Sequence, residues 1–279
     1  MAVRFIVNGH ESNSIPASDR GLQYGDGLFE TMAAKDGRIA LLDDHLERLG
    51  YGADRLGLPQ PEMEVIREEV LRLVPGQGRA VIKLILTRGS GGRGYREPEQ
   101  VEIRRIVSRN PWPNYPDTWA NDGIAVRLCE TRLALDPVLA GLKTLNRLHQ
   151  VLARAEWDDP DVAEGLLLDA DDRVVCGTMS NLFLVRSGAL ITPDLDRSGV
   201  AGVMRKQILK IAARMGIDAR EKAVSLDDLS RADEIFVTNS LIMIWPVRQF
   251  EDRVCTVGPL TRRLQRALES SLSAAEVAS

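Results

Sequence analysis

The sequence predicts a two-domain α+β protein, and three observations support this fold class. The 279 residues suffice for one large or two medium-sized domains, and 44% of them are hydrophobic, enough for a substantial core. β-rich runs and amphipathic helical segments both occur along the chain. At residues 110–118 (NPWPNYPDT) three prolines and two aromatic residues show no periodicity. We therefore expect a smaller N-terminal domain at 1–109, an interdomain linker at 110–121 and a larger C-terminal domain at 122–279.

The first domain is expected to open with a β-hairpin. Residues 4–8 (RFIVN) are typical of a strand, and Asn8-Gly9 is a strong hairpin signal because both turn positions favour positive φ. The sequence KDGR predicts a second turn, between strands at 28–34 and 38–42. The other predicted elements are strands at 79–88 and 101–109, a helix at 61–74, and a helix capped by Asp43 with the apolar stripe Leu46, Leu49, Ala53 and Leu56.

The second domain is expected to combine a meander of short strands with several helices. The run EGLLL at 164–168 is typical of a strand that is buried on both faces. The predicted elements are strands at 123–130, 164–168, 173–176, 181–185, 189–192 and 234–239, a short apolar run at 243–247, and helices after Lys143, at 201–215 and at 259–272.

Composition narrows the function classes. A net charge of −4 and a pI of about 5.6 disfavour a nucleic-acid-binding protein. The chain has no basic segment followed by a long apolar run near its start and no window of about 18 apolar residues, so we expect a cytoplasmic protein without a membrane partner. The three histidines and the three cysteines lack metal-ligand spacing, and we expect neither a metal site nor a disulfide framework; the cysteines are Cys129, Cys176 and Cys255.

Lys143 stands out because the chain has 6 lysines among its 36 basic residues. It precedes a predicted helix that Thr144 or Asn146 could start. Near the positive end of a helix macrodipole an ammonium is disfavoured, and a neutral amine or imine is easier to keep. That setting suits a Schiff-base lysine, while the alternative is a solvated lysine ahead of an amphipathic helix. The apolar residues at helical spacing are Leu145, Leu148, Val151, Leu152 and Ala155.

Three other features could serve a phosphate-bearing aldehyde cofactor together with Lys143. The predicted helix start at 202–204 offers backbone N–H groups behind small residues, which is an anion site in outline. Arg48 could pair with a phosphate, and the loop TRGSGGRGY at 87–95 supplies flexible backbone and further arginine. Taken singly, Arg48 is equally explained as a solvated residue and the loop as a plain hairpin. Its glycines join two strands and do not form a dinucleotide fingerprint.

Seven strings, in order from about residue 4 to about residue 250, resemble the fold-type IV pyridoxal-phosphate enzymes. They are SDRGLQYGDGLFET, LLDDHLERL, RGSGGRGY, AGLKTLNRLHQVLARAEW, TMSNLFLV, ITPDLDRSGVAGVMR and EIFVTNSLIMIWPV. The resemblance implies a small N-terminal α/β sandwich, a larger C-terminal β-barrel-like domain with helices, and a homodimer with its site between domains and near the subunit interface.

Within that family, RGSGGRGY and GLKTLNRL are most similar to the aminodeoxychorismate lyases. These enzymes of folate synthesis convert 4-amino-4-deoxychorismate to 4-aminobenzoate and pyruvate. The alternative is a branched-chain or D-amino-acid aminotransferase of the same fold, which would use the same lysine.

The resemblance also implies roles for individual residues. Lys143 stands at the position of the Schiff-base lysine, and Arg48 at that of the arginine that binds the cofactor phosphate. The implied phosphate-binding backbone consists of Gly202, Val203 and Met204 at a helix start and of Asn239 and Ser240 in a second turn. Three residues fall in the segment that shapes the substrate side, where a dicarboxylate must be held: Arg88, Arg93 and Tyr95.

Cys176 departs from the family pattern. Counted back from Asn181, it occupies the position of the acidic residue that pairs with the pyridine nitrogen. A carboxylate there keeps the nitrogen protonated and strengthens the ring as an electron sink, whereas a thiol with a pKa of about 8.5 is a poor acceptor unless it is ionised. A nearby pyridinium would favour the thiolate. A natural variant, an engineered change and a protein that has drifted from catalysis remain open, as does a small buried apolar role.

Two further alternatives belong to other functional classes. TRGSGGRGYR could act as an arginine–glycine RNA-binding segment, although one copy in a chain of net charge −4 disfavours this. A relative that binds the cofactor but is inactive is the other. The sequence leaves the roles of Glu30 and Thr31 open, because strand packing would explain both equally well.

Overall fold

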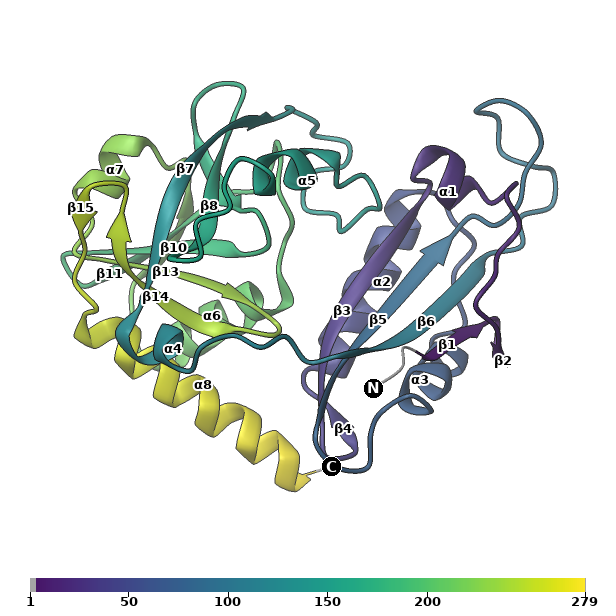
Figure 1. The fold of residues 1–279 in the computed structure, drawn as a ribbon, viewed down its shortest axis with the longest axis horizontal. Coiled ribbons are helices and arrows are strands. Elements are labelled where there is room, and N and C mark those ends of the chain that lie inside the picture. Colours follow the sequence, from purple (N-terminus) through teal and green to yellow (C-terminus); the bar gives the residue numbers. More distant parts are fainter. Residues whose placement is uncertain (1–3, 279) are drawn as a thin grey trace. The chain divides into compact units, whose positions relative to one another are not determined.

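A computed structural model describes residues 4–278, and the chain divides into two compact units (Figure 1). The N-terminal unit is the chain up to Asn114 together with Leu142–Asn146, and the C-terminal unit is Tyr115–Gly141 together with the chain from Arg147 onward. The change of unit after Asn114 falls within the stretch 110–121 expected to link the domains. Leu142–Asn146, expected in the second domain, groups with the first unit because its backbone pairs with residues 27–29.

The N-terminal unit contains an antiparallel six-stranded sheet in the order β2-β1-β6-β5-β3-β4. Its predicted turns are confirmed: Asn8 and Gly9 have φ of 46° and 83°, and Asp36 and Gly37 have φ of 47° and 86°. The strands are β1 (Arg4–Val7), β2 (His10–Glu11), β3 (Gly27–Lys35), β4 (Arg38–Ile39), β5 (Arg79–Thr87) and β6 (Arg104–Pro111), and the helices are α1 (Arg20–Tyr24), α2 (Leu42–Arg55) and α3 (Met63–Leu71).

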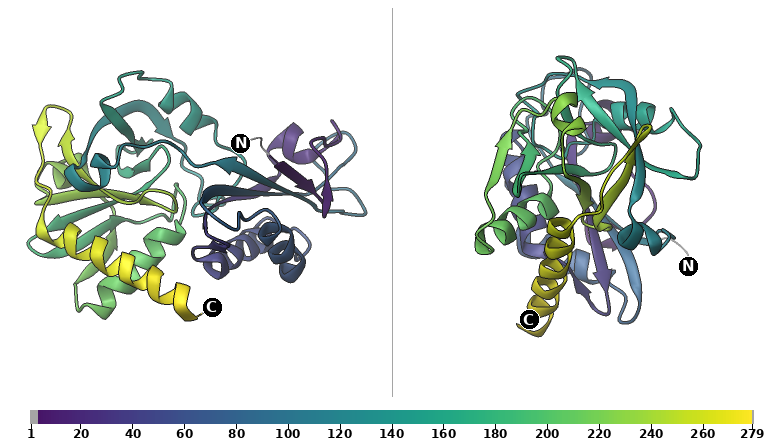
Figure 2. Two further views of the ribbon diagram at one scale, coloured as in Figure 1. Left: turned by 60° about the horizontal axis from the view of Figure 1, so that its bottom comes forward. Right: turned by 90° about the vertical axis from the view of Figure 1, so that its left-hand side faces the viewer.

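Helices α2 and α3 cover one face of this sheet (Figure 2). The stripe predicted for α2 is buried at Leu46, Leu49 and Ala53, and each buried leucine contributes about 1.5–3 kcal/mol relative to an exposed one. The predicted cap is wrong: Leu41, in a left-handed conformation, is the N-cap, and Asp43 lies in the first turn. There its carboxylate still favours the positive end of the helix dipole.

In the C-terminal unit six strands close into a barrel in the order β10-β13-β14-β7-β8-β9, with β9 pairing back to β10 at Cys176 and Asn181. This confirms the β-barrel-like prediction. The run Leu166–Leu168 is fully buried, as expected for a strand covered on both faces. The strands are β7 (Ile124–Leu133), β8 (Val162–Asp169), β9 (Val174–Gly177), β10 (Asn181–Arg186), β11 (Ala189–Pro193), β12 (Ala219–Lys222), β13 (Glu234–Asn239), β14 (Met243–Phe250) and β15 (Arg253–Val254).

Up to Ala278, the last residue described, the helices that accompany the barrel are α4 (Thr118–Asp122), α5 (Leu148–Arg154), α6 (Val203–Arg214), α7 (Leu226–Ser230) and α8 (Pro259–Ala278). Helices α6 and α8 pack against each other and against β13. The carboxylate of Glu234 in β13 accepts hydrogen bonds from the backbone N–H groups of Leu260 and Thr261, at 3.0 and 2.7 Å, which satisfies donors in the first turn of α8. Helix and barrel are thereby joined at a buried polar contact.

The helix expected behind Lys143 differs from the prediction. α5 begins at Leu148, so Lys143 lies well before its first turn and outside the reach of its dipole. Lys143 belongs to an extended segment in which Thr144 bridges Leu28 of β3. Leu148, Val151 and Leu152 are 68%, 61% and 54% exposed, and α5 packs on β7 and β8 through the buried Ala153. The macrodipole explanation for this lysine is therefore wrong.

Candidate active site

Lys143 is positioned by backbone pairing with β3. The Phe29 N–H donates to the Lys143 carbonyl at 3.0 Å, and the Leu145 N–H donates to the Gly27 carbonyl at 3.0 Å. The Lys143 Nζ lies 4.1 Å from the centroid of the Phe29 ring, a cation–π distance. This lysine is partly buried. Strand geometry thus fixes the side chain that the sequence singled out.

Next to Phe29, Glu30 forms a buried polar network with α2. Its carboxylate accepts a hydrogen bond from Arg48 Nε at 2.8 Å and a second from Arg48 Nη2. The His45 Nδ1 lies 2.6 Å from Glu30 Oε2. Burial alone raises the pKa of Glu30, but the Arg48 charge and the hydrogen bonds from His45 and Arg48 outweigh it and hold the pKa at about 2. Glu30 is therefore ionised and bridges the strand to the helix.

His45 is a neutral member of this network. Complete burial lowers its pKa from 6.5, and the charges of Arg48 and Lys143 lower it further, against the opposing effect of Glu30. Because an ionised carboxylate can only accept a hydrogen bond, the proton of the imidazole is assigned to Nδ1. The sequence reasoning missed His45 and left Glu30 open. The available signal was the spacing of His45 and Arg48, three residues apart on one helix face.

In the C-terminal unit, the start of α6 has the features of an anion site. Gly202 is its N-cap, and no side chain caps the first turn that contains Val203 and Met204. A Cβ atom on Gly202 would lie 2.0 Å from Asn181 Oδ1, while Asn181 Nδ2 donates to the Val200 carbonyl at 2.8 Å. Asn181 therefore holds the chain that leads into the helix, and only glycine fits beside it. The residues at this helix start fit a phosphate group.

The turn between β13 and β14 is built by Asn239. Its Oδ1 accepts hydrogen bonds from the N–H groups of Leu241 and Ile242, at 2.8 and 3.0 Å. Its Nδ2 donates to the Met179 carbonyl at 3.1 Å. The Asn239 side chain is thus engaged in the turn, so a phosphate-binding role of Asn239 would have to use its backbone.

Cys176 lies in β9, directly opposite Asn181 of β10, and is buried. Burial first, and then the nearby charge of Glu164, raise the pKa of Cys176 to about 12, while Arg147 opposes them. The thiol is therefore neutral at pH 7. Of the two states that the sequence left open for this cysteine, the structure favours the thiol over the thiolate.

Glu164 is a buried acidic residue that sequence reasoning treated as part of a strand. Its Oε1 accepts from the Thr178 N–H at 3.0 Å and from the Thr178 hydroxyl at 2.5 Å, and its Oε2 accepts from the Ser180 hydroxyl at 2.7 Å. It also accepts from the Met179 N–H at 3.2 Å. Glu164 thereby fixes the short connection from Cys176 to Asn181. An acidic residue opening an apolar strand was the only hint in the sequence.

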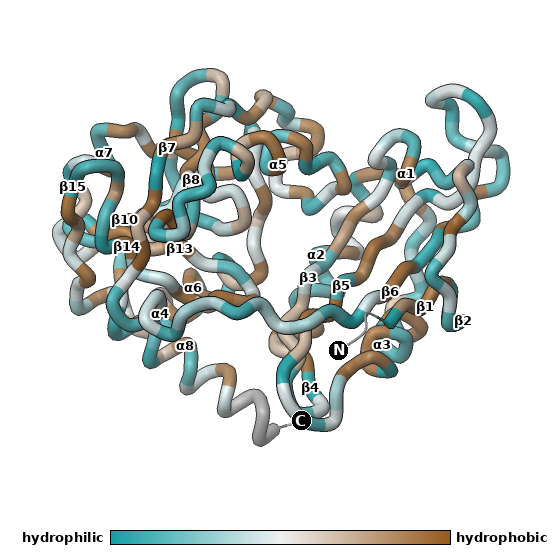
Figure 3. Tube along the Cα trace, in the orientation of Figure 1, coloured by the Kyte–Doolittle hydropathy of each residue, from teal (hydrophilic) through white to brown (hydrophobic). Residues whose placement is uncertain are grey.

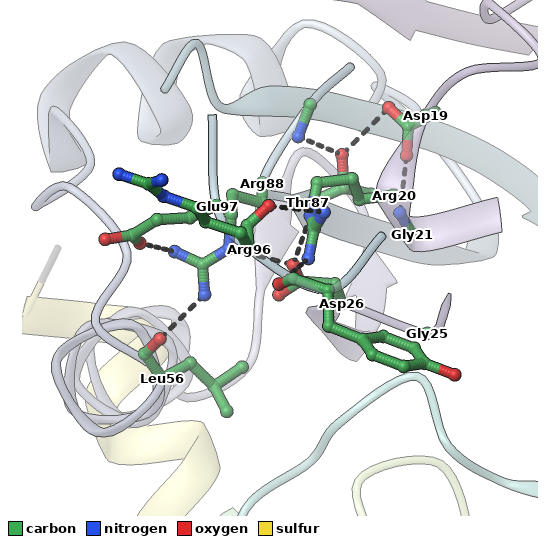
Figure 4. A network of polar contacts seen from close by, with 12 residues as sticks. Asp19, Arg20, Gly21, Gly25, Asp26, Leu56, Thr87, Arg88, Arg96 and Glu97 are labelled. Atoms are coloured by element: carbon green, nitrogen blue, oxygen red, sulfur yellow. Dashed lines mark hydrogen bonds and ion pairs between the residues drawn. The ribbon is translucent and has the colours of Figure 1, made fainter. Parts of the chain in front are cut away.

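The three residues expected on the substrate side differ in their exposure to solvent. Arg88 is buried, and its Nε donates to Asp26 Oδ2 at 2.8 Å while its Nη2 donates to the Leu56 carbonyl at 2.8 Å (Figure 4). Arg93 is exposed, and Tyr95 is 87% exposed. The Arg88 guanidinium is thus engaged with the protein itself, whereas Arg93 and Tyr95 lie at the surface of their loop.

Two other properties of the described residues bear on function. Within residues 4–278 there is no group of three or more His, Cys, Asp or Glu side chains that could hold a metal ion. No helix in the same range is long and apolar enough to cross a membrane.

Comparison with known proteins identifies the class. The family model of amino-transferase class IV matches residues 27–250, and the chain belongs to this family. An aminodeoxychorismate lyase of Vibrio harveyi is 37% identical over 95% of this chain and 100% of that protein. The crystal structure of 4-amino-4-deoxychorismate lyase from Pseudomonas aeruginosa is 48% identical, with a TM-score of 0.92, and the match covers 96% of this chain and 99% of that one.

A more distant structure has the same fold. The branched-chain amino acid aminotransferase from Escherichia coli is 26% identical, with a TM-score of 0.84, over 98% of this chain and 95% of that one. The predicted fold class and the predicted family are confirmed by these matches. Lyases and aminotransferases therefore share the scaffold described above.

Proposed function

We propose that this chain is a pyridoxal-5'-phosphate-dependent lyase that converts 4-amino-4-deoxychorismate to 4-aminobenzoate and pyruvate. The observation that carries the proposal is its 48% identity to the Pseudomonas aeruginosa lyase over 96% of the chain. The partly buried Lys143 beside Phe29 and the uncapped start of α6 are consistent with a cofactor that carries both an aldehyde and a phosphate. The reaction would contribute 4-aminobenzoate to folate synthesis.

We assign the cofactor contacts as follows. Lys143 would bind the aldehyde carbon through Nζ. The first-turn backbone at Gly202, Val203 and Met204 would bind the phosphate, supported by the backbone of the Asn239–Ser240 turn. Arg48, which Glu30 holds through Nε and Nη2, is assigned to the same phosphate. Cys176 would face the ring nitrogen. When bound, pyridoxal phosphate supplies a conjugated ring that accepts electron density from a bond broken beside the substrate nitrogen.

The chemical work then belongs to Lys143. With the cofactor and the substrate bound, the free amine of Lys143 would be the base that removes the proton from C4 of the substrate. The bond between the substrate ring and the enolpyruvyl oxygen breaks, and a proton returned by the same lysine to the enolpyruvate carbon gives pyruvate. A neutral His45 avoids a third positive charge beside Lys143 and Arg48. The same lysine thus serves as base and as acid.

A neutral Cys176 fits a lyase better than an aminotransferase. With a pKa of about 12 this thiol cannot hold a proton on a ring nitrogen in the way a carboxylate does. Elimination from 4-amino-4-deoxychorismate forms a benzene ring, and that aromatic stabilisation drives the reaction. An aminotransferase runs reversibly with a small driving force, so a weakened electron sink would slow it more.

The proposal includes a homodimer in the cytoplasm. Hydrophobic residues occur along α5 (Figure 3). Leu148, Val151 and Leu152 form an exposed apolar face on this helix, which we assign to contact with a second copy of the chain. Three large apolar side chains at helical spacing are costly to leave in water. We expect this face to be covered in solution.

The test is an assay for both products with purified protein and pyridoxal phosphate. We expect an absorbance band from the bound cofactor, and formation of 4-aminobenzoate and pyruvate in equal amounts from 4-amino-4-deoxychorismate. Lys143→Ala should lose the band and both products. Lys83→Ala is a matched control, because the Lys83 Nζ lies 5.3 Å from the same Phe29 ring. Amino transfer to pyruvate or 2-oxoglutarate without 4-aminobenzoate would refute the lyase and favour a branched-chain or D-amino-acid aminotransferase.

A further inference from the structure

One carboxylate connects two buried arginines below the loop 88–103, which joins β5 to β6 (Figure 4). Asp26 Oδ2 accepts a hydrogen bond from Arg20 Nε at 2.8 Å and another from Arg88 Nε at 2.8 Å. Burial alone raises the pKa of Asp26, but the hydrogen bonds and charges of Arg88 and Arg20 outweigh it and lower the pKa. The carboxylate is therefore ionised and aligns both guanidinium groups.

The remaining N–H groups of the Arg20 guanidinium donate hydrogen bonds to the tip of the loop. Its Nη1 donates to the Gly94 carbonyl at 3.1 Å and to the Arg96 carbonyl at 3.3 Å, and its Nη2 donates to the Tyr95 carbonyl at 3.1 Å. Three successive carbonyl groups are thus bound by one planar guanidinium, a geometry that the single ammonium of lysine cannot reproduce. The ring of Tyr24 adds an edge contact to Tyr95, with centroids 5.5 Å apart.

The base of the loop is fixed by the same elements. The Arg20 N–H donates to the Gly89 carbonyl at 2.8 Å. Gly89 has a φ of 81°, and a Cβ there would lie 1.9 Å from the Glu102 carbonyl oxygen, so the two ends of the loop are in close backbone contact. Arg88 donates to the carbonyls of Leu56 and Gly57, at 2.8 and 3.0 Å, and so joins the loop base to the end of α2.

The anchored loop exposes charged side chains of both signs: Arg93 and Arg96 at its tip, then Glu97, which pairs with the buried Arg88, and Glu99. The side chains of Arg93 and Arg96 are exposed on either side of Tyr95. A bidentate guanidinium suits a carboxylate, and a loop that is already ordered pays little conformational entropy when it binds. By contrast, Arg20 and Arg88 are buried and donate hydrogen bonds to Asp26 and to backbone carbonyls.

We propose that Arg20, Asp26 and Arg88 are positioning residues that hold the loop 88–103 so that Arg93 and Arg96 bind the carboxylates of the substrate. The identity of the substrate, a dicarboxylate, rests on the proposed function. The positioning residues do not contact the substrate themselves. Releasing the loop weakens substrate binding while cofactor binding and the chemistry at Lys143 are retained.

The first experiment compares wild-type enzyme with Arg20→Lys. In hydrogen exchange followed by mass spectrometry, the amides of residues 89–97 should exchange at least ~10-fold faster in the variant. The KM for 4-amino-4-deoxychorismate should rise about tenfold, equivalent to roughly 1.4 kcal/mol, while kcat and the cofactor absorbance band change little. Arg67→Lys is the matched control, because Arg67 is an arginine of the same unit paired with the exposed Asp43, and it should leave all three measurements unchanged.

A double-mutant cycle with Arg93→Ala separates positioning from folding. If Arg20 acts through Arg93, the KM of the double variant should be no higher than that of the worse single variant, because Arg93 in a released loop contributes nothing further. Asp26→Asn is the second route to release and should reproduce the effects of Arg20→Lys. The proposal is overturned if the exchange rates do not change in Arg20→Lys, or if the loop loosens without a rise in KM. It is also overturned if the effects of Arg20→Lys and Arg93→Ala on KM are additive.

The same variants separate this proposal from the proposed function. Wild-type protein that forms no 4-aminobenzoate would refute the lyase assignment. In that event the KM comparison uses 2-oxoglutarate, a dicarboxylate amino acceptor, with the same variants. An unchanged KM for that acceptor in Arg20→Lys would overturn the positioning role as well.

Discussion

His45 makes the stability of the N-terminal unit depend on pH. The pKa of His45 in the folded protein lies below its ordinary value of 6.5. As the pH falls below 6.5, the unfolded chain therefore binds a proton at this histidine that the folded chain does not bind. The pKa of Glu30 is about 2 in the folded state, against an ordinary value of 4.5, so its contribution is present above pH 4.5 and is lost as the pH falls toward 2. Both groups destabilise the protein on acidification, His45 from about pH 6.5 downward and Glu30 from about pH 4.5 downward.

We therefore predict that the free energy of unfolding of the N-terminal unit decreases below pH 6.5, by up to about 1.4 kcal/mol per pH unit for one proton. His45→Asn keeps a donor near the position of Nδ1 but does not titrate. In urea titrations monitored at several pH values, this variant should lose the decrease between pH 6.5 and 4.5 and keep the one below it. A wild-type curve that is flat over the upper range would contradict the assignment of a neutral His45.

Cys176 offers a second prediction at this scale. Cys176→Glu places a carboxylate where the thiol would face the ring nitrogen, and we expect the ratio of amino transfer to 4-aminobenzoate formation to rise by about tenfold or more. Cys176→Ser, which stays neutral, is the control and should keep the wild-type ratio. The ratio is measured from two rates, that of 4-aminobenzoate formation from 4-amino-4-deoxychorismate and that of amino transfer from an amino acid to 2-oxoglutarate. An unchanged ratio and an unchanged cofactor spectrum in Cys176→Glu would show that this position does not tune the ring.

Among the elements, the start of α6 gives the sharpest test of cofactor binding. In Gly202→Ala the new methyl group would lie 2.0 Å from Asn181 Oδ1, so Asn181 or the helix start must move. We expect overpacking to cost about 1–3 kcal/mol of stability, and the affinity for pyridoxal phosphate to fall by about tenfold or more as the first-turn amides are displaced. Spectrophotometric titration of the apoprotein measures the affinity.

Gly76→Ala is the control for this substitution, because a Cβ there would meet no atom within 4 Å. Its cofactor affinity should equal that of the wild type. Equal affinity in Gly202→Ala would mean that the phosphate is bound elsewhere.

Elements with a clear signal were predictable from the sequence, and some of the short ones were not. The hairpin at Asn8-Gly9 follows from turn chemistry, and β13 (Glu234–Asn239) from a β-rich run with matching bounds. By contrast, α7 and β12 have five and four residues, too few for any period to appear. Of the five apolar residues predicted to share a helix behind Lys143, Leu148, Val151 and Leu152 lie in α5, but periodicity cannot say whether such a face meets the core, a second chain or water.

The candidate site was predictable in part. A rare lysine and a glycine-rich helix start could be found because residue type and position carry the signal. The Glu30–His45 contact depends on which strand lies beside α2, and the inward turn of Arg88 depends on the position of Asp26. Such pairings are tertiary, so a single sequence does not contain them in any local pattern. The proposed substrate rests on identity with known lyases, because no element of the fold specifies it.

The whole molecule is expected to be a dimer through α5. Val151→Asp places a charge at the centre of the exposed face formed with Leu148 and Leu152. Burying an unpaired carboxylate is costly, so we predict that this variant sediments as a monomer at micromolar concentration while its unfolding transition in each unit is retained. Arg154→Asp, at the end of the same helix, is the control for a change of charge. A wild-type protein that sediments as a monomer would contradict the assignment of this face.

Closure of the barrel has a consequence for how the protein is made. The N-terminal sheet needs residues only up to Pro111, the end of β6, so it can form early on the ribosome. The barrel cannot close until β14, which ends at Phe250, has emerged to pair with β7. Cys176 and Asn181 are therefore synthesised long before the strands that complete their ring, and we expect a nascent chain to acquire pyridoxal phosphate only near the end of translation.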